Sequence, residues 1–268
     1  MRDMLTEVLD DLAAEADVLD GLVAGLDEAE WRLPTPADGW DIGQQIAHLA
    51  WTDEVAVLAA TDKRAWDDVV LAALEDPDGF VDVAAGAGAA VDSADLLARW
   101  RRGRRTLAET LAEHPPGEKL SWFGPPMSAT SMATARFMET WAHGRDVADA
   151  LGRPDAPTRR IRHLVHLGVR TRNFAFSLHG LDAPEDEFRV ELVAPDGGLW
   201  TYGPQDAEQV VRGPAYDFCL LVTQRRHRAD LALTASGPDA ETWLGIAQAF
   251  AGPPGAGRKA AASDSEAS

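Results

Sequence analysis

Residues 132–151 read MATARFMETWAHGRDVADAL, a stretch free of proline that predicts one long helix. Gly152 follows directly and Pro154 comes two residues later, a combination typical of a helix C-terminus. Glu139 and His143 stand four residues apart in this helix, so their side chains project from one face and can reach a common ion. The next question is which other helices pack against the face that carries Glu139 and His143.

Four further segments have helical character. In residues 4–26 leucines recur near helical spacing with acids between them, and residues 42–61 are rich in alanine and lack proline. The helix-breaking residues Pro115 and Pro116 end the segment 93–114. The loop WRLPTPADGW delivers Trp40 to a helix whose N-cap is expected to be Asp41. Residues 62–92 predict a looser insertion with one short helix. The expected helices cover residues 4–26, 42–61, 93–114, 132–151 and 159–180, which predicts a helical bundle over residues 1–182.

The character of the sequence changes after Asp182. FRVELVAP at 188–195 alternates apolar and polar residues, and the turn PDGG leads into LWTYG, which together predict a β-hairpin. EQVVRG and DLALTAS read as further strands, and AYDFCLLVTQRR and DAETWLGIAQAFAG as helices. The sequence therefore predicts an α plus α+β fold, with a small α+β domain at 183–258. Residues 259–268 have the composition of a disordered tail.

The charge balance limits the partners of this chain. It has 25 Lys and Arg against 44 Asp and Glu, and the formal net charge of −19 repels the phosphates of nucleic acids and anionic lipids. Neither an N-terminal targeting segment nor an apolar run long enough to cross a bilayer is apparent, so we expect a cytoplasmic protein without nucleic-acid or membrane partners. The single cysteine, Cys219, lies in an apolar run, and we expect burial to keep its thiol inert.

A third ligand for an ion is available on the helix at 42–61. His48 lies among alanine and leucine there, and facing helices of a bundle commonly share a metal between them. With Glu139 and His143 it forms a set of two imidazoles and a carboxylate, which binds a divalent ion and leaves coordination positions open. The alternative is an ordinary helical pair at i and i+4, worth about 0.2–0.5 kcal/mol.

Three neighbouring residues have helical spacing from these ligands. Gln44 lies one turn before His48 and Trp51 nearly one turn after it, so both are candidates for lining a substrate pocket, with an aromatic residue of the core as the alternative for Trp51. Asp146 follows His143 by three residues. It is a candidate for orienting the imidazole of His143, with a surface acid as the alternative.

The strings PTPADGWDIGQQIAHLAWTDE at 34–54 and FMETWAHGRDVADALG at 137–152 resemble the two diagnostic segments of the mycothiol-dependent maleylpyruvate isomerase N-terminal domain. That domain is a branch of the DinB-like four-helix bundles, and the resemblance extends over most of the predicted bundle. It implies that His48, Glu139 and His143 are metal ligands, with zinc as the first choice and nickel, iron or manganese as alternatives.

The C-terminal region resembles the smaller domain of those isomerases, which has a sterol-carrier-protein-like α+β fold. The family pattern has a Gly, an apolar helix and an Arg near the helix end, and here Gly213 and YDFCLLV are followed by Arg225 and Arg226. We expect one of these arginines, Arg225 first, to bind an anionic group of the substrate through its planar guanidinium. A pair of arginines that caps the preceding helix is the alternative.

The resemblance implies an enzyme that uses mycothiol or a similar low-molecular-weight thiol. Because no usable nucleophile is apparent in the chain, we expect a bound metal to activate a thiol from outside, for isomerisation of, or S-transfer to, a small and anionic electrophile. Two alternatives stay open. One is a binding protein that holds a metal and a ligand without turnover. The other is a non-haem iron oxygenase, which also uses two histidines and a carboxylate.

Overall fold

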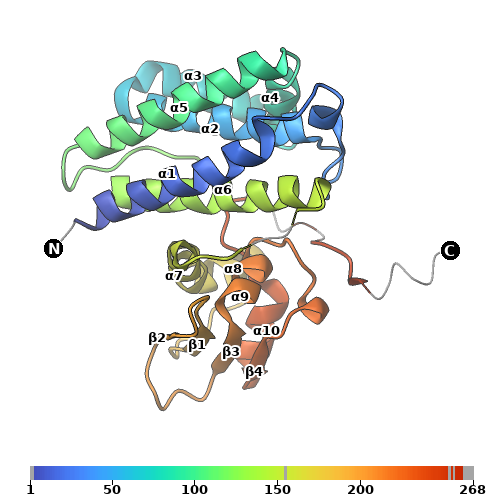
Figure 1. Cartoon of the computed structure of the whole chain (residues 1–268). Helices are drawn as coiled ribbons and strands as arrows, with labels where there is room; N and C mark the ends of the chain where they lie inside the picture. The colour runs from blue at the N-terminus through green and yellow to red at the C-terminus, as the bar shows by residue number, and fades with distance from the viewer. Residues whose placement is uncertain (1–2, 154–155, 253–254, 256, 262–268) are drawn as a thin grey trace. The chain divides into compact units, whose positions relative to one another are not determined.

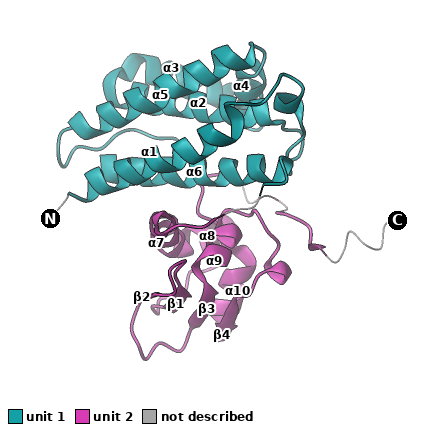
Figure 2. Ribbon diagram, in the orientation of Figure 1, with its two compact units in different colours: residues 1–155 teal, residues 156–268 magenta. Residues whose placement is uncertain are grey.

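A computed structural model describes residues 3–153, 156–252, 255 and 257–261 of the chain. The chain folds into two compact units, residues 1–155 and residues 156–268 (Figure 2). The first unit is built of helices, and the second combines a small sheet with helices. The predicted α plus α+β fold is therefore confirmed.

Four long helices form a bundle in the described part of the first unit (Figure 1). They are α1 (Met4–Val23), α2 (Ile42–Thr61), α5 (Ser93–Glu113) and α6 (Ala129–Ala150). Helix α1 packs along α6 and α2 packs along α5, while α2 also lies against α6. The helix that carries Glu139 and His143 is therefore next to the helix that carries His48.

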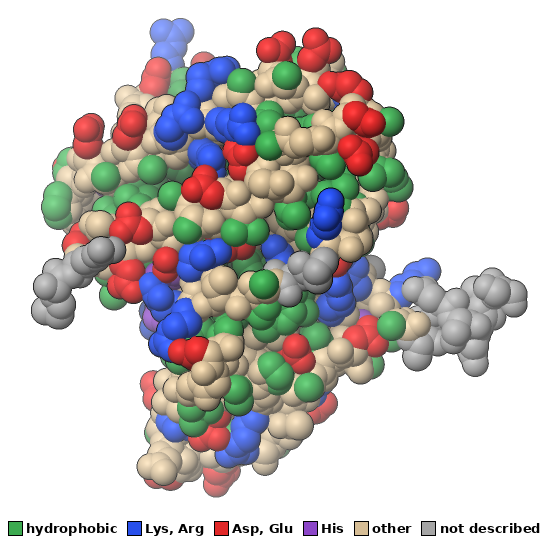
Figure 3. Space-filling view, in the orientation of Figure 1, with side chains coloured by type: hydrophobic (Ala, Val, Ile, Leu, Met, Phe, Trp, Pro, Cys, Tyr) green, Lys and Arg blue, Asp and Glu red, His purple; other side chains and the backbone are tan. Residues whose placement is uncertain are grey.

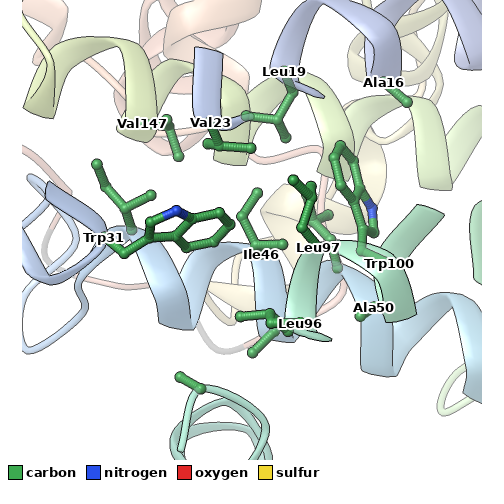
Figure 4. Packing of buried hydrophobic residues seen from close by; sticks show 14 residues of the cluster. Ala16, Leu19, Val23, Trp31, Ile46, Ala50, Leu96, Leu97, Trp100 and Val147 are labelled. Atoms are coloured by element: carbon green, nitrogen blue, oxygen red, sulfur yellow. The ribbon is translucent and has the colours of Figure 1, made fainter. Parts of the chain in front are cut away.

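Apolar side chains hold the bundle together. Leu19 of α1, Ile46 of α2 and Trp100 of α5 belong to one buried cluster (Figure 4). Another cluster joins Leu107 of α5 to Met132 of α6. Burying one large apolar side chain contributes about 1.5–3 kcal/mol relative to leaving it exposed, so clusters of this size fix the helices against one another.

The insertion after α2, which is described throughout, holds two helices, so the prediction of a single short helix is wrong. They are α3 (Lys63–Glu75), capped by the side chain of Asp62, and α4 (Phe80–Gly88). Helix α4 packs closely on α2, because a Cβ at Gly88 would lie only 2.9 Å from the Cβ of Ala47. The small residues of VAAGAGAA thus allow close helix packing, where the sequence pattern suggested a looser insertion.

The start of α2 follows the capping signal of the sequence, whereas α5 and α6 begin at other residues than expected. Asp41 is the N-cap of α2: its carboxylate accepts from the amide of Gln44 at 2.7 Å, and the Gln44 side chain accepts from the amide of Asp41 at 3.0 Å. The hydroxyl of Ser128 caps α6 by accepting from the amide of Ser131. Ser93, expected as the cap of α5, is its first residue, and Asp92 is the N-cap.

In the described part of the second unit, four strands form one sheet in the order β2-β1-β3-β4. β1 (Arg189–Val193) pairs antiparallel with β2 (Leu199–Tyr202), as in the predicted hairpin, and parallel with β3 (Val210–Pro214). β3 pairs antiparallel with β4 (Thr234–Ser236). The helices of this unit are α7 (Arg162–Arg170), α8 (Arg172–Leu178), α9 (Ala215–Val222) and α10 (Pro238–Ile246).

The predicted fifth helix is two helices, because α7 ends at Arg170 and α8 begins at Arg172. Helix α7 packs on α9 and α8 packs on α10. The α7 contact is close, since a Cβ at Gly168 would lie 2.8 Å from the ring of Phe218. Both helices belong to the second unit, so the boundary predicted at residue 182 falls inside that unit and the chain divides at residue 155.

Of the predicted tail at 259–268, residues 262–268 lie outside the described residues. None of the described helices combines the length and the hydrophobicity that crossing a membrane requires. Acidic and basic side chains are interspersed with hydrophobic ones on the face shown in Figure 3.

Candidate metal centre

His48 on α2 and the pair Glu139 and His143 on α6 come together in the first unit. Nε2 of His48 lies 3.4 Å from Oε2 of Glu139, and Nε2 of His143 lies 3.2 Å from the same oxygen. One potential ligand atom from each residue lies within 4.8 Å of the other two. Among the described residues, this triad is the group of histidines, cysteines and acids whose spacing suits a single metal ion.

Glu139 supplies a negative charge to the triad. Burial alone would raise the pKa of its carboxyl, but the adjacent imidazoles of His143 and His48 hold that pKa well below its usual range. The imidazole side chains of His48 and His143 are 10% and 11% exposed, whereas the Glu139 side chain is 23% exposed. The open side of the triad is therefore at the carboxylate.

Gln45 determines how the ring of His143 is oriented. Its Nε2 donates to Oγ1 of Thr35 at 2.8 Å, and that hydroxyl donates to the carbonyl of Trp40 at 2.8 Å. The amide oxygen of Gln45 is thereby turned toward His143 and accepts a hydrogen bond from Nδ1. With a proton on Nδ1, the ring directs the lone pair of Nε2 toward Glu139, which is the orientation that a metal ligand requires.

Two half-buried tryptophans flank the imidazoles. The ring of Trp40 stacks on that of His143 at a centroid distance of 5.9 Å and an interplanar angle of 18°, and it lies 5.3 Å from the ring of His48. The indole N–H of Trp40 donates to Asp82 of α4 at 2.8 Å. Trp51 lies 6.1 Å from His48 on its other side along α2. These rings keep water away from the imidazoles, which strengthens electrostatic interactions there.

The donor set fits a divalent cation. An unprotonated Nε2 of His143 and the ionised carboxylate of Glu139 would face one another at 3.2 Å, an arrangement that needs a proton or a cation between the two atoms. Nδ1 of His48 is buried and has no hydrogen-bond partner among the described residues, so the ring of His48 lacks an outer contact like the one that Gln45 makes with His143. Two imidazole nitrogens and a carboxylate oxygen suit zinc, and also iron, nickel or manganese.

Two residues predicted to lie around the triad have different surroundings. The side-chain oxygen of Gln44 is engaged in the capping box with Asp41. Asp146 is fully buried, so the alternative of a surface acid is wrong. Its role in orienting His143 stays a prediction, next to the observed contact between His143 and Gln45.

Arg225 and Arg226 follow α9 in the second unit and contact backbone carbonyls. Nη1 of Arg225 donates at 2.7 Å to the carbonyl of Thr223, the C-cap of α9, and Nη1 of Arg226 donates at 2.7 Å to the carbonyl of Arg225. The Arg225 contact satisfies the carbonyl of the C-cap, whereas the Arg226 contact lies beyond the helix end. The binding of an anionic group by either arginine stays a prediction.

Comparison with known families matches both units. The family model described as mycothiol maleylpyruvate isomerase N-terminal domain matches residues 12–148. A model described as wyosine base formation matches residues 184–236, which span the strands of the second unit. The first match includes His48, Glu139 and His143.

Several known proteins are similar to this chain over most of its length. Two proteins of Mycobacterium tuberculosis, from strains CDC 1551 / Oshkosh and ATCC 25618 / H37Rv and both described as uncharacterized, are 57% identical over 248 residues, which is 92% of this chain and 96% of each relative. Crystal structures of mycothiol-dependent maleylpyruvate isomerase and of a histidine-to-alanine mutant of it are similar with TM-scores of 0.60 and 0.61 at 16% identity, over 95% of this chain and 99% of those chains. The likeness to these structures establishes a common fold.

Proposed function

The chain belongs to the family of the mycothiol maleylpyruvate isomerase N-terminal domain, and from this premise we propose that it is a metal-dependent enzyme that uses mycothiol or a similar low-molecular-weight thiol. We propose further that it catalyses isomerisation of, or S-transfer to, a small electrophile. The observation that supports this proposal most is the convergence of His48, Glu139 and His143 on one point.

The thiol has to come from solution, because the single thiol of the chain is out of reach. Cys219 is fully buried, and burial raises the pKa of its thiol well above the usual range. The thiolate is the reactive form of cysteine, so a buried neutral thiol is a poor nucleophile. A small thiol that diffuses to the triad avoids both obstacles.

A divalent ion held by His48, Glu139 and His143 would lower the pKa of a thiol bound beside it, so that the thiolate forms near neutral pH. Neighbouring residues keep two of the three ligands in the protonation states that metal binding requires. Gln45 keeps the proton of His143 on Nδ1, and the low pKa of Glu139 keeps its carboxylate charged. Trp40 shields both imidazoles from water.

Thiolate addition accounts for both reaction classes. In an isomerisation, the sulfur forms a C–S bond to one carbon of a conjugated double bond, and the π electrons move toward the activating group. Rotation about the new single bond follows, and loss of the thiolate restores the double bond. In an S-transfer, the C–S bond is kept and the neighbouring carbon takes a proton.

For the substrate we propose an anionic electrophile, with Arg225 first and Arg226 second as the groups that bind its charge. Arg225→Lys keeps the charge but loses the two-pronged donor, so we expect a higher KM for an anionic substrate and unchanged metal content. If Arg225→Ala and Arg226→Ala both show wild-type kinetics, the arginines only contact backbone carbonyls, and this part of the proposal is abandoned.

Consumption of an electrophile in the presence of a thiol tests the proposed function. We expect turnover of maleylpyruvate or another α,β-unsaturated carboxylate only when mycothiol or a comparable thiol is added, and a loss of roughly 100-fold or more in Glu139→Gln. Turnover that consumes oxygen without thiol would favour an iron oxygenase instead. Tight binding of metal and electrophile without any turnover would favour a binding protein.

A further inference from the structure

A pocket of about 380 Å³ opens in the first unit beside the inserted helix α3. Its walls are mainly aromatic and aliphatic: Trp66, Val70 and Leu74 come from α3, and Trp122, Phe123 and Pro126 from the segment between α5 and α6. Small-molecule sites in proteins have volumes of about 300–1,000 Å³ and mostly apolar linings. The pocket therefore has the size and the surface of a ligand site.

The walls of the pocket are held by the fold. Leu120 and Met127 pair as an antiparallel bridge, with N–H to carbonyl distances of 2.8 and 3.0 Å, and thereby close residues 121–126 into a short hairpin. Leu120 is 1% exposed and anchors this hairpin in the bundle core. The ring of Trp122 stacks on that of Trp66 at 5.8 Å and 17°. The aromatic surface is therefore formed before any ligand binds.

Large apolar side chains at the pocket are exposed. Leu74 is 69% exposed and Phe123 is 44% exposed, although both line the same pocket as the buried Trp66. Exposed apolar side chains grouped around buried aromatic rings are typical of a binding site. Such a group is unfavourable in water unless a ligand covers it.

Ring contacts connect the pocket with the candidate metal centre. The centroid distances are 6.1 Å from His48 to Trp51, 5.1 Å from Trp51 to Phe80, 6.0 Å from Phe80 to Phe123 and 5.0 Å from Phe123 to Trp66. All these residues belong to the first unit. A series of aromatic ring contacts thus leads from an imidazole of the triad to the pocket.

The charges at the pocket disfavour an anion. Among its described lining residues there is no lysine or arginine, and the ionisable side chain is that of Asp67, which pairs with Lys63 at 2.6 Å. An anionic group placed in the pocket would lose its hydration without gaining a partner. An uncharged planar ring can instead stack on the indole and phenyl faces.

We propose that this pocket binds an uncharged planar ring group, the aromatic part of the substrate. As an assignment of substrate class this rests on the proposed function, and the anionic end of such a substrate lies outside the pocket. Binding of the ring itself requires neither metal nor thiol, so it can be tested separately.

N-phenyl-1-naphthylamine, an uncharged dye that becomes fluorescent in apolar surroundings, tests the pocket in the full-length protein. We expect saturable binding of about one dye per chain, unchanged in Glu139→Gln and weakened roughly tenfold in Trp122→Ala. The dye 1-anilinonaphthalene-8-sulfonate has the same ring system with an added negative charge, and we expect it to bind roughly tenfold more weakly than the uncharged dye.

Two leucines of α3 provide a matched pair. Leu74, 69% exposed, lines the pocket, whereas Leu71, 59% exposed, is not among its lining residues. Leu74→Ser should weaken dye binding roughly threefold or more, and Leu71→Ser should leave it unchanged, with helical content checked by circular dichroism in both. Absence of saturable binding, equal effects of the two leucine variants, or equal affinity for the two dyes would overturn the assignment. If the dyes bind with the expected affinities but the protein shows no thiol-dependent turnover, the pocket is a ring-binding site and only the proposed function is wrong.

Discussion

Gln45 is the residue that connects the candidate metal centre to the loop before α2. It accepts from Nδ1 of His143 and donates to Thr35. Removing such a partner of a metal-bound histidine typically lowers metal affinity by about 10–100-fold. Gln45→Leu keeps the approximate size and removes both hydrogen bonds, so we expect a loss of that magnitude in competition with a chromogenic chelator.

The neighbouring Gln44 supplies the control for this prediction. Its side chain completes the capping box of α2 with Asp41 and has no recorded contact with the triad. Gln44→Leu should lower the free energy of unfolding by about 1 kcal/mol and leave metal affinity unchanged. Wild-type affinity in a folded Gln45→Leu would mean that the contact with His143 does not position the ring.

Cys219→Ala should leave thiol-dependent turnover within about twofold of wild type, because the buried thiol does not ionise near neutral pH. Alanine is preferable to serine here, since it buries no hydroxyl in the core of α9. Steady-state rates at saturating external thiol provide the measurement. A folded but inactive Cys219→Ala would contradict the proposal that the thiol comes from solution.

The sequence could indicate the triad and the position of Trp51 beside it, but not the contact with Gln45. Glu139 and His143 share one helix face, His48 was expected on a facing helix, and the family resemblance implied all three as ligands. Gln45 escaped detection because its contact crosses from α2 to α6, and spacing along one helix carries no information about a facing helix. Gln44, chosen for its position one turn before His48, is rotated about 100° around the helix from Gln45 and is engaged in the capping box.

A buried ion pair joins the two helices that carry the triad. Nε of Arg136 on α6 donates at 2.9 Å to Asp53 on α2, and the two residues are 2% and 4% exposed. Burial raises the pKa of Asp53, although Arg136 acts in the opposite direction. Removing one partner leaves a buried charge without compensation, so Asp53→Ala and Arg136→Ala should each lower the free energy of unfolding by about 3–5 kcal/mol.

The double variant Asp53→Leu with Arg136→Met tests whether this cost comes from the unpaired charge. Two apolar side chains of similar size should recover most of the stability in denaturant unfolding followed by circular dichroism. If the double variant were as unstable as the sum of the two single variants, the pair would not act as a unit.

Helices α1 and α5 are joined by Asp20, which accepts from Nε of Arg101 at 2.7 Å and also pairs with Arg104. The hydrogen bond from Arg101 lowers the pKa of Asp20, against the effect of burial. Because the folded pKa lies below the unfolded one, the stabilisation is present above pH about 4 and is lost as the pH falls through the folded pKa.

Asp20→Asn should therefore cost about 1 kcal/mol at pH 7 and less as the medium becomes acidic. Asp17 contacts the same Arg104 at 2.9 Å but has a side chain that is 71% exposed, and Asp17→Asn should cost below about 0.5 kcal/mol. The free energies of unfolding of the two variants are measured in urea at pH 7 and at pH 3. A cost for Asp20→Asn that does not depend on pH would contradict the ion-pair interpretation.

Elements with strong local signals could be predicted, and elements decided by packing could not. Helix α2 spans Ile42–Thr61 as expected, because Asp41 and an alanine-rich run define it locally. The break at Thr171 between α7 and α8 has no glycine or proline to mark it. Helix α4 forms because its small residues fit against α2, a contact that the local sequence does not reveal.

Across the whole molecule, the sequence located the change from helices to strands but not the division into units. The composition changes near residue 182, where the strands begin, whereas the chain divides at residue 155. Helices α7 and α8 lie in the second unit because they pack on α9 and α10. Local periodicity does not reveal such long-range packing. The segment 159–180 was therefore assigned to the helical bundle only because its sequence is helical.

The central claim concerns the triad as a metal site, and the metal content of the whole purified protein tests it most directly. Plasma mass spectrometry should find about one divalent ion per chain in the wild type, and His48→Ala, Glu139→Gln and His143→Ala should each lose most of it. His179→Ala, which removes an exposed histidine outside the triad, should retain full occupancy. Full occupancy in folded Glu139→Gln and His143→Ala would contradict the claim.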